Sequence, residues 1–223
     1  MENRKHTSLK DLAQALGVSI PTVSRALKDS PEISRELCAK AKALAKEMNY
    51  RPNPFAMSLR KNAPRIIGVI VPDIVTHFFA SILNGIENMA IANGYFVIIT
   101  TSHESYEHEK RNIENLVNMR VEGIIACLSQ ETTDFSHISA LKDINMPLIL
   151  FDRVCLTDQF SSVIADGAQS AQMATQHLLD NGSERVAFIG GANHLDIVKR
   201  RKHGYLEALR ENRIPIEKEL VVC

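Results

Sequence analysis

Two patterns of apolar residues divide the sequence. Up to about residue 62, single apolar residues recur at helical spacing within polar segments, as Leu9, Leu12 and Leu16 do. Beyond that point, unbroken apolar runs such as Ile66–Val71 alternate with segments whose apolar residues repeat every three or four positions. The first pattern predicts a small helical head, and the second predicts alternating strands and helices.

The head carries signals for three helices. Ser8 and Asp11 have the spacing of a capping box, and Gly17 can take the left-handed conformation that ends a helix. Ser19 is a second N-cap candidate, and a third helix is predicted over Arg35–Met48.

The body is predicted to be α/β. The predicted strands are Ile66–Val71, Tyr95–Thr100, Gly123–Cys127, Leu148–Phe151, Val163–Ala165 and Val186–Ile189. The predicted helices are a segment from Phe79 to Ala90, then Glu107–Met119, Phe135–Ile144, Ala168–Asn181 and Val198–Asn212. Fully apolar strands between amphipathic helices indicate a parallel sheet covered on both faces, in which ligands bind beyond the carboxyl ends of the strands.

Length and composition agree with a globular protein of one to two domains. Of the 223 residues, 45% are hydrophobic, which excludes wholesale disorder. The longest apolar runs are far shorter than the roughly 20 residues of a membrane helix, and the polar N-terminus resembles no signal segment, so a cytoplasmic protein is expected. Scattered cysteines without a Cys-x-x-Cys pair favour buried free thiols over disulfides or zinc: Cys38, Cys127, Cys155 and Cys223.

A net charge of zero conceals a separation of charge. Residues 1–62 hold twelve Lys/Arg and six Asp/Glu, a net of +6, whereas residues 63–223 hold fourteen and twenty, a net of −6. A basic head on an acidic body favours contact between the head and a polyanion. The predicted domains are the helical head over 1–52, a hinge helix or linker over 53–63, and the α/β body over 64–223.

The segment Leu9–Lys28 has the form of a helix-turn-helix. In such a unit the second helix enters the major groove of double-stranded DNA, and a protruding arginine can bond guanine through two hydrogen bonds. A small helical domain with an exposed basic face is the alternative.

Several motifs closely resemble lactose-repressor-type (LacI/GalR) regulators. In the head they are Thr7-Ser8-Leu9-Lys10-Asp11-Leu12-Ala13, Gly17-Val18-Ser19, Thr22-Val23-Ser24-Arg25 and Asn49-Tyr50-Arg51-Pro52-Asn53. In the body they are Ile67-Gly68-Val69-Ile70-Val71-Pro72-Asp73, Phe78-Phe79, Leu150-Phe151-Asp152-Arg153, His177-Leu178-Leu179 and Ile189-Gly190-Gly191. The resemblance implies a homodimeric transcription factor, a repressor. In it residues 1–52 form a helix-turn-helix DNA-binding domain, and residues 64–223 form a periplasmic-binding-protein-like effector domain that binds a sugar or related metabolite.

The resemblance also assigns DNA contacts on a palindromic operator. Ile20, Pro21 and Arg25 match base-reading positions, and Pro21 departs from the usual polar residue, which shifts discrimination toward Arg25. Ser19, Thr22 and Ser24 match phosphate contacts. Leu59 matches a leucine that enters the minor groove, with Arg60 as its basic neighbour, and Leu9 and Asn53 complete the predicted DNA contacts.

For the effector, the resemblance assigns Phe78 and Phe79 to an aromatic wall, Asp152 to a ligand-bonding carboxylate and Arg201 to a ligand-gripping arginine, with Asp73 beside the wall. Each has a structural alternative: Phe79 as core, Asp152 as a helix cap, Arg201 as part of a solvated basic run. Asp166-Gly167 replaces the family's frequent Asp-Asn.

No catalysis, metal or cofactor is indicated. His103 and His108 lack metal-site spacing, and Gly190-Gly191 lacks the rest of a dinucleotide fingerprint. The 161 residues after residue 62 are few for two lobes, so the second lobe is expected to be incomplete. Two other functions stay open: a sugar- or nucleoside-binding protein without a DNA role, and a shortened form that binds DNA but senses no ligand.

Overall fold

The computed structural model describes residues 7–50 and 65–222, which form two compact units, Met1–Asn62 and Ala63–Cys223. The hinge expected over 53–63, with the DNA contacts predicted for Asn53, Leu59 and Arg60, lies outside the described residues.

The first unit has three helices in its described part: α1 (Leu9–Leu16), α2 (Ile20–Ala26) and α3 (Arg35–Glu47). The predicted capping box at Ser8 is present, and Gly17 ends α1 with a φ of 65°. Leu12, Val23, Ala26 and Ala41 are fully buried between the helices. These small and branched side chains hold α2 against α1 and α3 and leave its opposite side in solvent.

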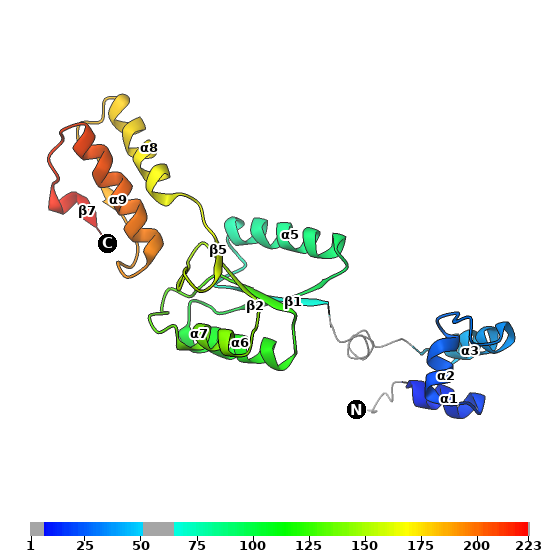
Figure 1. Cartoon of the computed structure of the whole chain (residues 1–223). Coiled ribbons are helices and arrows are strands. Elements are labelled where there is room, and N and C mark those ends of the chain that lie inside the picture. Colours follow the sequence, from blue (N-terminus) through cyan, green and yellow to red (C-terminus); the bar gives the residue numbers. More distant parts are fainter. Residues whose placement is uncertain (1–6, 51–64, 223) are drawn as a thin grey trace, which may run out of the picture. The chain divides into compact units, whose positions relative to one another are not determined.

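The second unit is built on a five-stranded parallel sheet with the order β2-β1-β3-β4-β5. The strands are β1 (Ile66–Val71), β2 (Phe96–Thr101), β3 (Gly123–Ala126), β4 (Leu148–Phe151) and β5 (Ser161–Val163). Helix α5 (His77–Ala92) packs Phe79 and Leu83 on one face. Helices α6 (Tyr106–Asn118) and α7 (Ser136–Asp143) cover the other face, so the strands lie between helices as predicted (Figure 1).

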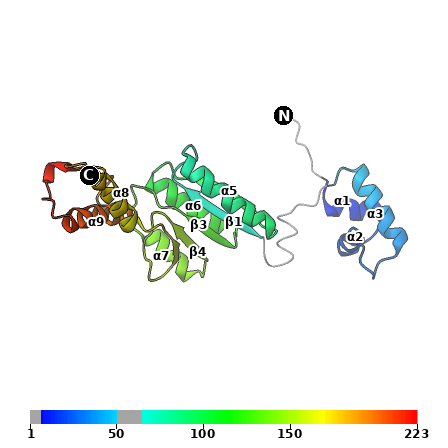
Figure 2. The ribbon, with the colours of Figure 1, turned by 90° about the horizontal axis from the view of Figure 1, so that it is seen from above.

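The remaining elements of this unit follow β5 in the chain. They are α8 (Gly167–Asp180), β6 (Phe188–Ile189), α9 (Asp196–Glu211), the 3-10 helix η1 (Lys218–Leu220) and β7 (Val221–Val222). Strands β6 and β7 pair in parallel as a separate two-stranded sheet. Helices α8 and α9 lie side by side in both views (Figure 1, Figure 2). They approach closely at Gly204, where a Cβ atom would lie 1.9 Å from the carbonyl oxygen of Ala168.

Strands β2 and β3 differ from their predicted bounds by one residue, and two other strands differ by two residues. Strand β5 lies two residues earlier than the apolar run Val163–Ala165, because an exposed edge strand forms its ladder without apolar side chains. Strand β6 is shorter than Val186–Ile189. Val186 is buried there, but its carbonyl oxygen accepts a hydrogen bond from the Tyr205 hydroxyl at 2.8 Å instead of pairing in a sheet.

Candidate DNA-binding surface and effector site

Helix α2 presents the residues predicted to contact DNA on its exposed side. Its N-cap, Ser19, accepts a hydrogen bond from the backbone N–H of Thr22 at 3.3 Å, and the two hydroxyls lie 2.8 Å apart. Ile20 and Pro21 are exposed in the first turn. The surface therefore offers hydroxyls and an apolar patch at the start of the helix, where the helix dipole favours anions.

The other predicted head contacts occupy different environments. Arg25 projects from the last turn of α2, and Ser24 beside it is partly exposed. Leu9 is partly buried and packs against the helical core, which favours a structural role for its side chain.

Arg25 has an acidic neighbour that the sequence pattern did not reveal. Its Nη1 donates to Oε2 of Glu32 at 2.8 Å, and both side chains are largely exposed, by 59% and 66%. Glu32 lies in the turn between α2 and α3, seven positions along the chain.

In the second unit, polar residues gather where the parallel strands end. Asp73 follows β1, Glu104 follows β2, and Asp152 and Arg153 follow β4. Arg153 donates to both carboxylate oxygens of Glu104 at 2.6 and 3.0 Å and to the carbonyl oxygen of Leu128 at 3.2 Å. The arginine thus joins the ends of β2, β3 and β4.

Charged groups at the strand ends shift the pKa of Glu104. Burial alone would raise the pKa of Glu104, but hydrogen bonds from Arg153 and from the backbone N–H of Gln130 outweigh burial and hold that pKa below its ordinary value. Asp73 lies close enough to oppose this effect. Its own Oδ1 accepts from the backbone N–H of Val75 at 3.0 Å.

Asp152 has a backbone conformation unusual for a carboxylate residue, with a φ of 58°. It caps no helix. Half-burial raises the pKa of its carboxyl, and the positive charges of Arg153 and Arg201 offset only part of this rise. Asp152 and Arg201 line the same cavity of about 30 Å³.

A larger cavity adjoins this one. It has a volume of about 420 Å³, within the range of small-molecule sites, and shares Asp196 and Arg200 with the smaller cavity. Arg153, Lys199 and Thr157 add further polar groups to its wall.

The two aromatic residues predicted for the effector wall differ in exposure. Phe78 is 50% exposed, whereas Phe79 is only 7% exposed and belongs to the core between α5 and the sheet. Their rings meet edge to face at 5.1 Å, and Phe79 in turn meets Phe151 at 6.4 Å. This placement favours the core role for Phe79 and leaves Phe78 as the exposed ring. Asp166, whose role the resemblance left open, caps α8 by accepting from the backbone N–H of Gln169 at 3.0 Å.

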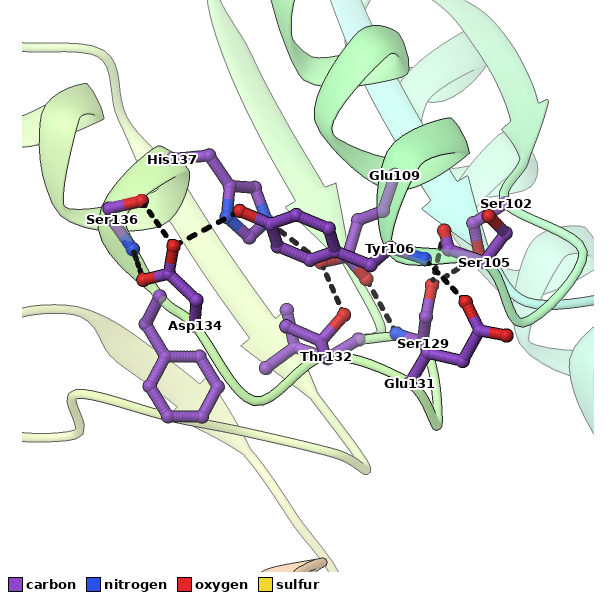
Figure 3. A network of polar contacts seen from close by, with 12 residues as sticks. Ser102, Ser105, Tyr106, Glu109, Ser129, Glu131, Thr132, Asp134, Ser136 and His137 are labelled. Carbon is purple, nitrogen blue, oxygen red and sulfur yellow. Dashed lines mark hydrogen bonds and ion pairs between the residues drawn. The ribbon is translucent and has the colours of Figure 1, made fainter.

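A buried polar network supports the loop after β3 (Figure 3). Glu109 of α6 is 1% exposed and accepts hydrogen bonds from the backbone N–H of Ser129, from Thr132 Oγ1 at 2.9 Å and from His137 Nε2 at 2.8 Å. The ring of Tyr106 covers His137 edge to face at 5.1 Å. Since both carboxylate oxygens of Glu109 accept from the loop or from α7, the network fixes the loop that also lines the larger cavity.

Sequence reasoning missed Glu32, Glu104 and the pair of Glu109 with His137. Only Glu109 has a signal in the sequence: it falls on the apolar stripe of α6 with Ile113 and Leu116. A carboxylate on a buried stripe needs polar partners, although the stripe does not say which.

Among the described residues, no group of three or more His, Cys, Asp or Glu side chains could hold a metal ion, and no helix is long and apolar enough to cross a membrane. Cys38, Cys127 and Cys155 are buried free thiols, as predicted, and burial raises the pKa of Cys127 to about 12.

Comparison with known proteins places both units. Residues 8–53 match the family model "Bacterial regulatory proteins, lacI family", and residues 65–222 match "Periplasmic binding proteins and sugar binding domain of LacI family". Catabolite control protein A of Priestia megaterium is 31% identical over 222 residues, covering 97% of this chain and 65% of that protein. The ribose operon repressor of Bacillus subtilis is 31% identical over 210 residues, covering 94% and 62%.

Solved structures agree with these matches. The lac repressor dimer bound to operator and the anti-inducer ONPF has a TM-score of 0.76 at 26% identity, covering 95% of this chain and 64% of that one. The chain thus spans less than two thirds of the length of the relatives it matches. The relatives named here are regulators of gene expression by name, and the two family models together cover nearly all of the described residues. The chain belongs to the LacI family of bacterial regulatory proteins.

Proposed function

We propose that this protein is a sequence-specific DNA-binding transcriptional regulator, a repressor controlled by a sugar or related metabolite. The observation that carries the proposal is the exposed side of α2, with Arg25 and the capped N-terminus of the helix, on a unit of net charge +6. A cytoplasmic homodimer on a palindromic operator is part of the proposal, as is the absence of enzymatic activity.

The proposed division of the chain follows its two units. Residues 1–52 bind DNA, residues 53–63 connect, and residues 64–223 hold the effector. The proposed DNA contacts are Leu9, Ser19, Ile20, Pro21, Thr22, Ser24, Arg25, Asn53, Leu59 and Arg60. The boundary between the compact units, after Asn62, supports a division in this region.

Selection from randomised DNA tests the first half of the proposal. The 223-residue chain is mixed with a library of duplexes randomised over two helical turns, at physiological salt, and bound duplexes are sequenced. We expect a two-fold symmetric consensus, because a dimer reads two half-sites one helical turn apart. Binding without any consensus would favour the alternative of a ligand-binding protein that meets DNA only through its charge.

The effector half of the proposal places a ligand beyond the strand ends. Asp152 and Asp73 supply acceptors for ligand hydroxyls, Arg201 donates to ligand oxygens, and the exposed ring of Phe78 covers an apolar ligand face, backed by Phe79. What supports this is the shared cavity of Asp152 and Arg201 and the adjoining volume of about 420 Å³. Hydroxyl-rich ligands suit such a mixed wall of carboxylates, a guanidinium and an aromatic ring.

Thermal melting with a panel of sugars, sugar phosphates and nucleosides tests this half. A ligand at a hundred times its dissociation constant stabilises the folded state by about 2.7 kcal/mol, which raises the melting temperature. The rise should disappear in Arg201→Ala. A chain that selects a DNA consensus but responds to no member of the panel would match the alternative that binds DNA without sensing a ligand.

A further inference from the structure

Glu32 is held in place beside Arg25 by the backbone of the turn. The backbone N–H of Ser30 donates to the carbonyl oxygen of Arg25 at 3.1 Å, and that of Ile33 donates to the carbonyl oxygen of Ser30 at 3.0 Å. Ile33 packs against the core of α2 and α3. The backbone position of Glu32 is therefore fixed by the turn, and its carboxylate accepts from Nη1 of Arg25 at 2.8 Å.

The contact uses only one nitrogen of the guanidinium. Within the part of the chain that the structure describes, Nε and Nη2 of Arg25 donate to no side chain or carbonyl, and Glu32 bonds Nη1 alone. A guanidinium has five N–H donors in a rigid plane. The edge formed by Nε and Nη2 keeps two parallel N–H groups, which is the geometry that guanine O6 and N7 accept.

We propose that Glu32 is a positioning residue that sets the base discrimination of Arg25, an inference that rests on the proposed DNA-binding function. By holding Nη1, the carboxylate fixes the plane of the guanidinium while the other edge reads guanine. A free arginine side chain has several rotatable bonds, so it can also reach phosphates, which carry no sequence information. Glu32 removes some of those alternatives.

The proposal gives affinity and discrimination opposite signs. A carboxylate near DNA opposes binding to any duplex, so its removal should leave affinity for a random duplex equal or higher. Discrimination should fall, because Arg25 loses its fixed plane. Exposed ion pairs of this kind change equilibria by a small amount, and the expected loss of discrimination is about two- to five-fold.

The test compares three variants of the 223-residue chain. Glu32→Ala removes the contact, and Glu32→Gln keeps an amide oxygen that accepts from Nη1 while removing the charge. Glu36→Gln is the matched control. Glu36 forms an equally short surface ion pair, 2.8 Å long, but its partner is Lys40 and not Arg25. The readout is the ratio of dissociation constants for the selected duplex and for the same duplex with each guanine replaced in turn.

We expect the ratio at one guanine per half-site to fall in Glu32→Ala, to fall less in Glu32→Gln, and to stay unchanged in Glu36→Gln. An unchanged or higher ratio in both Glu32 variants would overturn the proposal, as would an equal fall in the control. A change at a different base pair would make Glu32 a base-reading residue instead, and would also overturn it. If the wild-type chain selects no consensus, the proposed function itself fails. If the wild-type chain selects a consensus but both Glu32 variants keep the wild-type ratio of dissociation constants, this inference alone fails.

Discussion

Asp152 follows β4 in a left-handed backbone conformation, and its half-buried carboxyl has a raised pKa because burial disfavours the charged form. No hydrogen bond to the carboxylate compensates for this within the described residues, and Arg201 is near without bonding it. A charged group kept at such a cost is typical of a functional site, since the missing partner can be a ligand.

We predict that Asp152→Asn stabilises the unliganded protein at neutral pH. Because the folded pKa is raised, ionisation of Asp152 costs stability as pH rises through that pKa, and asparagine avoids the cost while tolerating a positive φ. The gain should be under about 1 kcal/mol, since the side chain is only partly buried. Urea denaturation should show the gain at pH 7 and lose it well below pH 4, where the carboxyl is protonated in both the folded and the unfolded state. The same variant should abolish the effector-dependent rise in melting temperature, and a variant that is less stable at pH 7 would contradict the argument.

Arg25→Ala should remove discrimination at one base pair of each half-site. A bidentate arginine–guanine contact is worth about 1–3 kcal/mol against a wrong base. Selection from the randomised library should return the wild-type consensus except at that position. If the whole consensus is retained and affinity falls uniformly, Arg25 contacts phosphate.

Glu109 shows how one buried side chain can determine the stability of a loop. Its carboxylate accepts from Ser129, Thr132 and His137, and all four residues are buried. Glu109→Ala leaves these donors without partners, and we expect a loss of about 3–5 kcal/mol in the free energy of unfolding. Chemical denaturation measures it, with Glu107→Ala on the exposed side of the same helix as control. A loss below about 1 kcal/mol would mean that water replaces the carboxylate.

At the scale of elements, the packing of α8 against α9 depends on the absence of a side chain at Gly204. Gly204→Ala would place its Cβ atom 1.9 Å from the Ala168 carbonyl oxygen and force the helices apart, at a cost of about 1–3 kcal/mol or more. Gly85→Ala, in α5, meets no atom within 4 Å and should instead stabilise its helix by up to about 1 kcal/mol. Thermal denaturation of the two variants should therefore shift in opposite directions. A Gly204→Ala variant as stable as the wild type or more stable would show that α8 and α9 do not approach so closely.

The elements themselves were largely predictable from local patterns. Helix α3 and strands β1 and β4 match their predictions closely, because capping residues and unbroken apolar runs act over a few positions. Strand β5 was displaced because an edge strand is defined by its partner, β4, and not by its own apolarity. The candidate site was likewise predictable only where local patterns determine it. Arg153 and Glu104 are 49 positions apart in the chain, and a contact at that separation follows from the strand order, which the local pattern does not contain.

At the scale of the whole molecule, equal numbers of positive and negative side chains are distributed unequally along the chain. The first 62 residues carry +6 and the rest −6, and each compact unit therefore presents a net charge of its own. Electrostatic contact with a polyanion depends on the local surface within about 10 Å at moderate salt, and not on the sum over the protein. Under the proposed function, this separation would let the head bind DNA while the molecule as a whole is neutral.

We therefore predict that the chain, at pH 7 and low salt, is retained on both cation-exchange and anion-exchange matrices despite its sequence pI of about 7.1. Retention on the cation exchanger requires the basic first unit, and retention on the anion exchanger requires the acidic second unit. Residues 63–223 alone should bind only the anion exchanger. Affinity for a random duplex should fall linearly with salt on a log–log plot, because each phosphate neutralised releases a counterion. Flow-through on both matrices would show that the two sets of charges neutralise each other within the folded protein. In that case the head would not act as an independent basic surface, and steep salt dependence of DNA binding should also be missing.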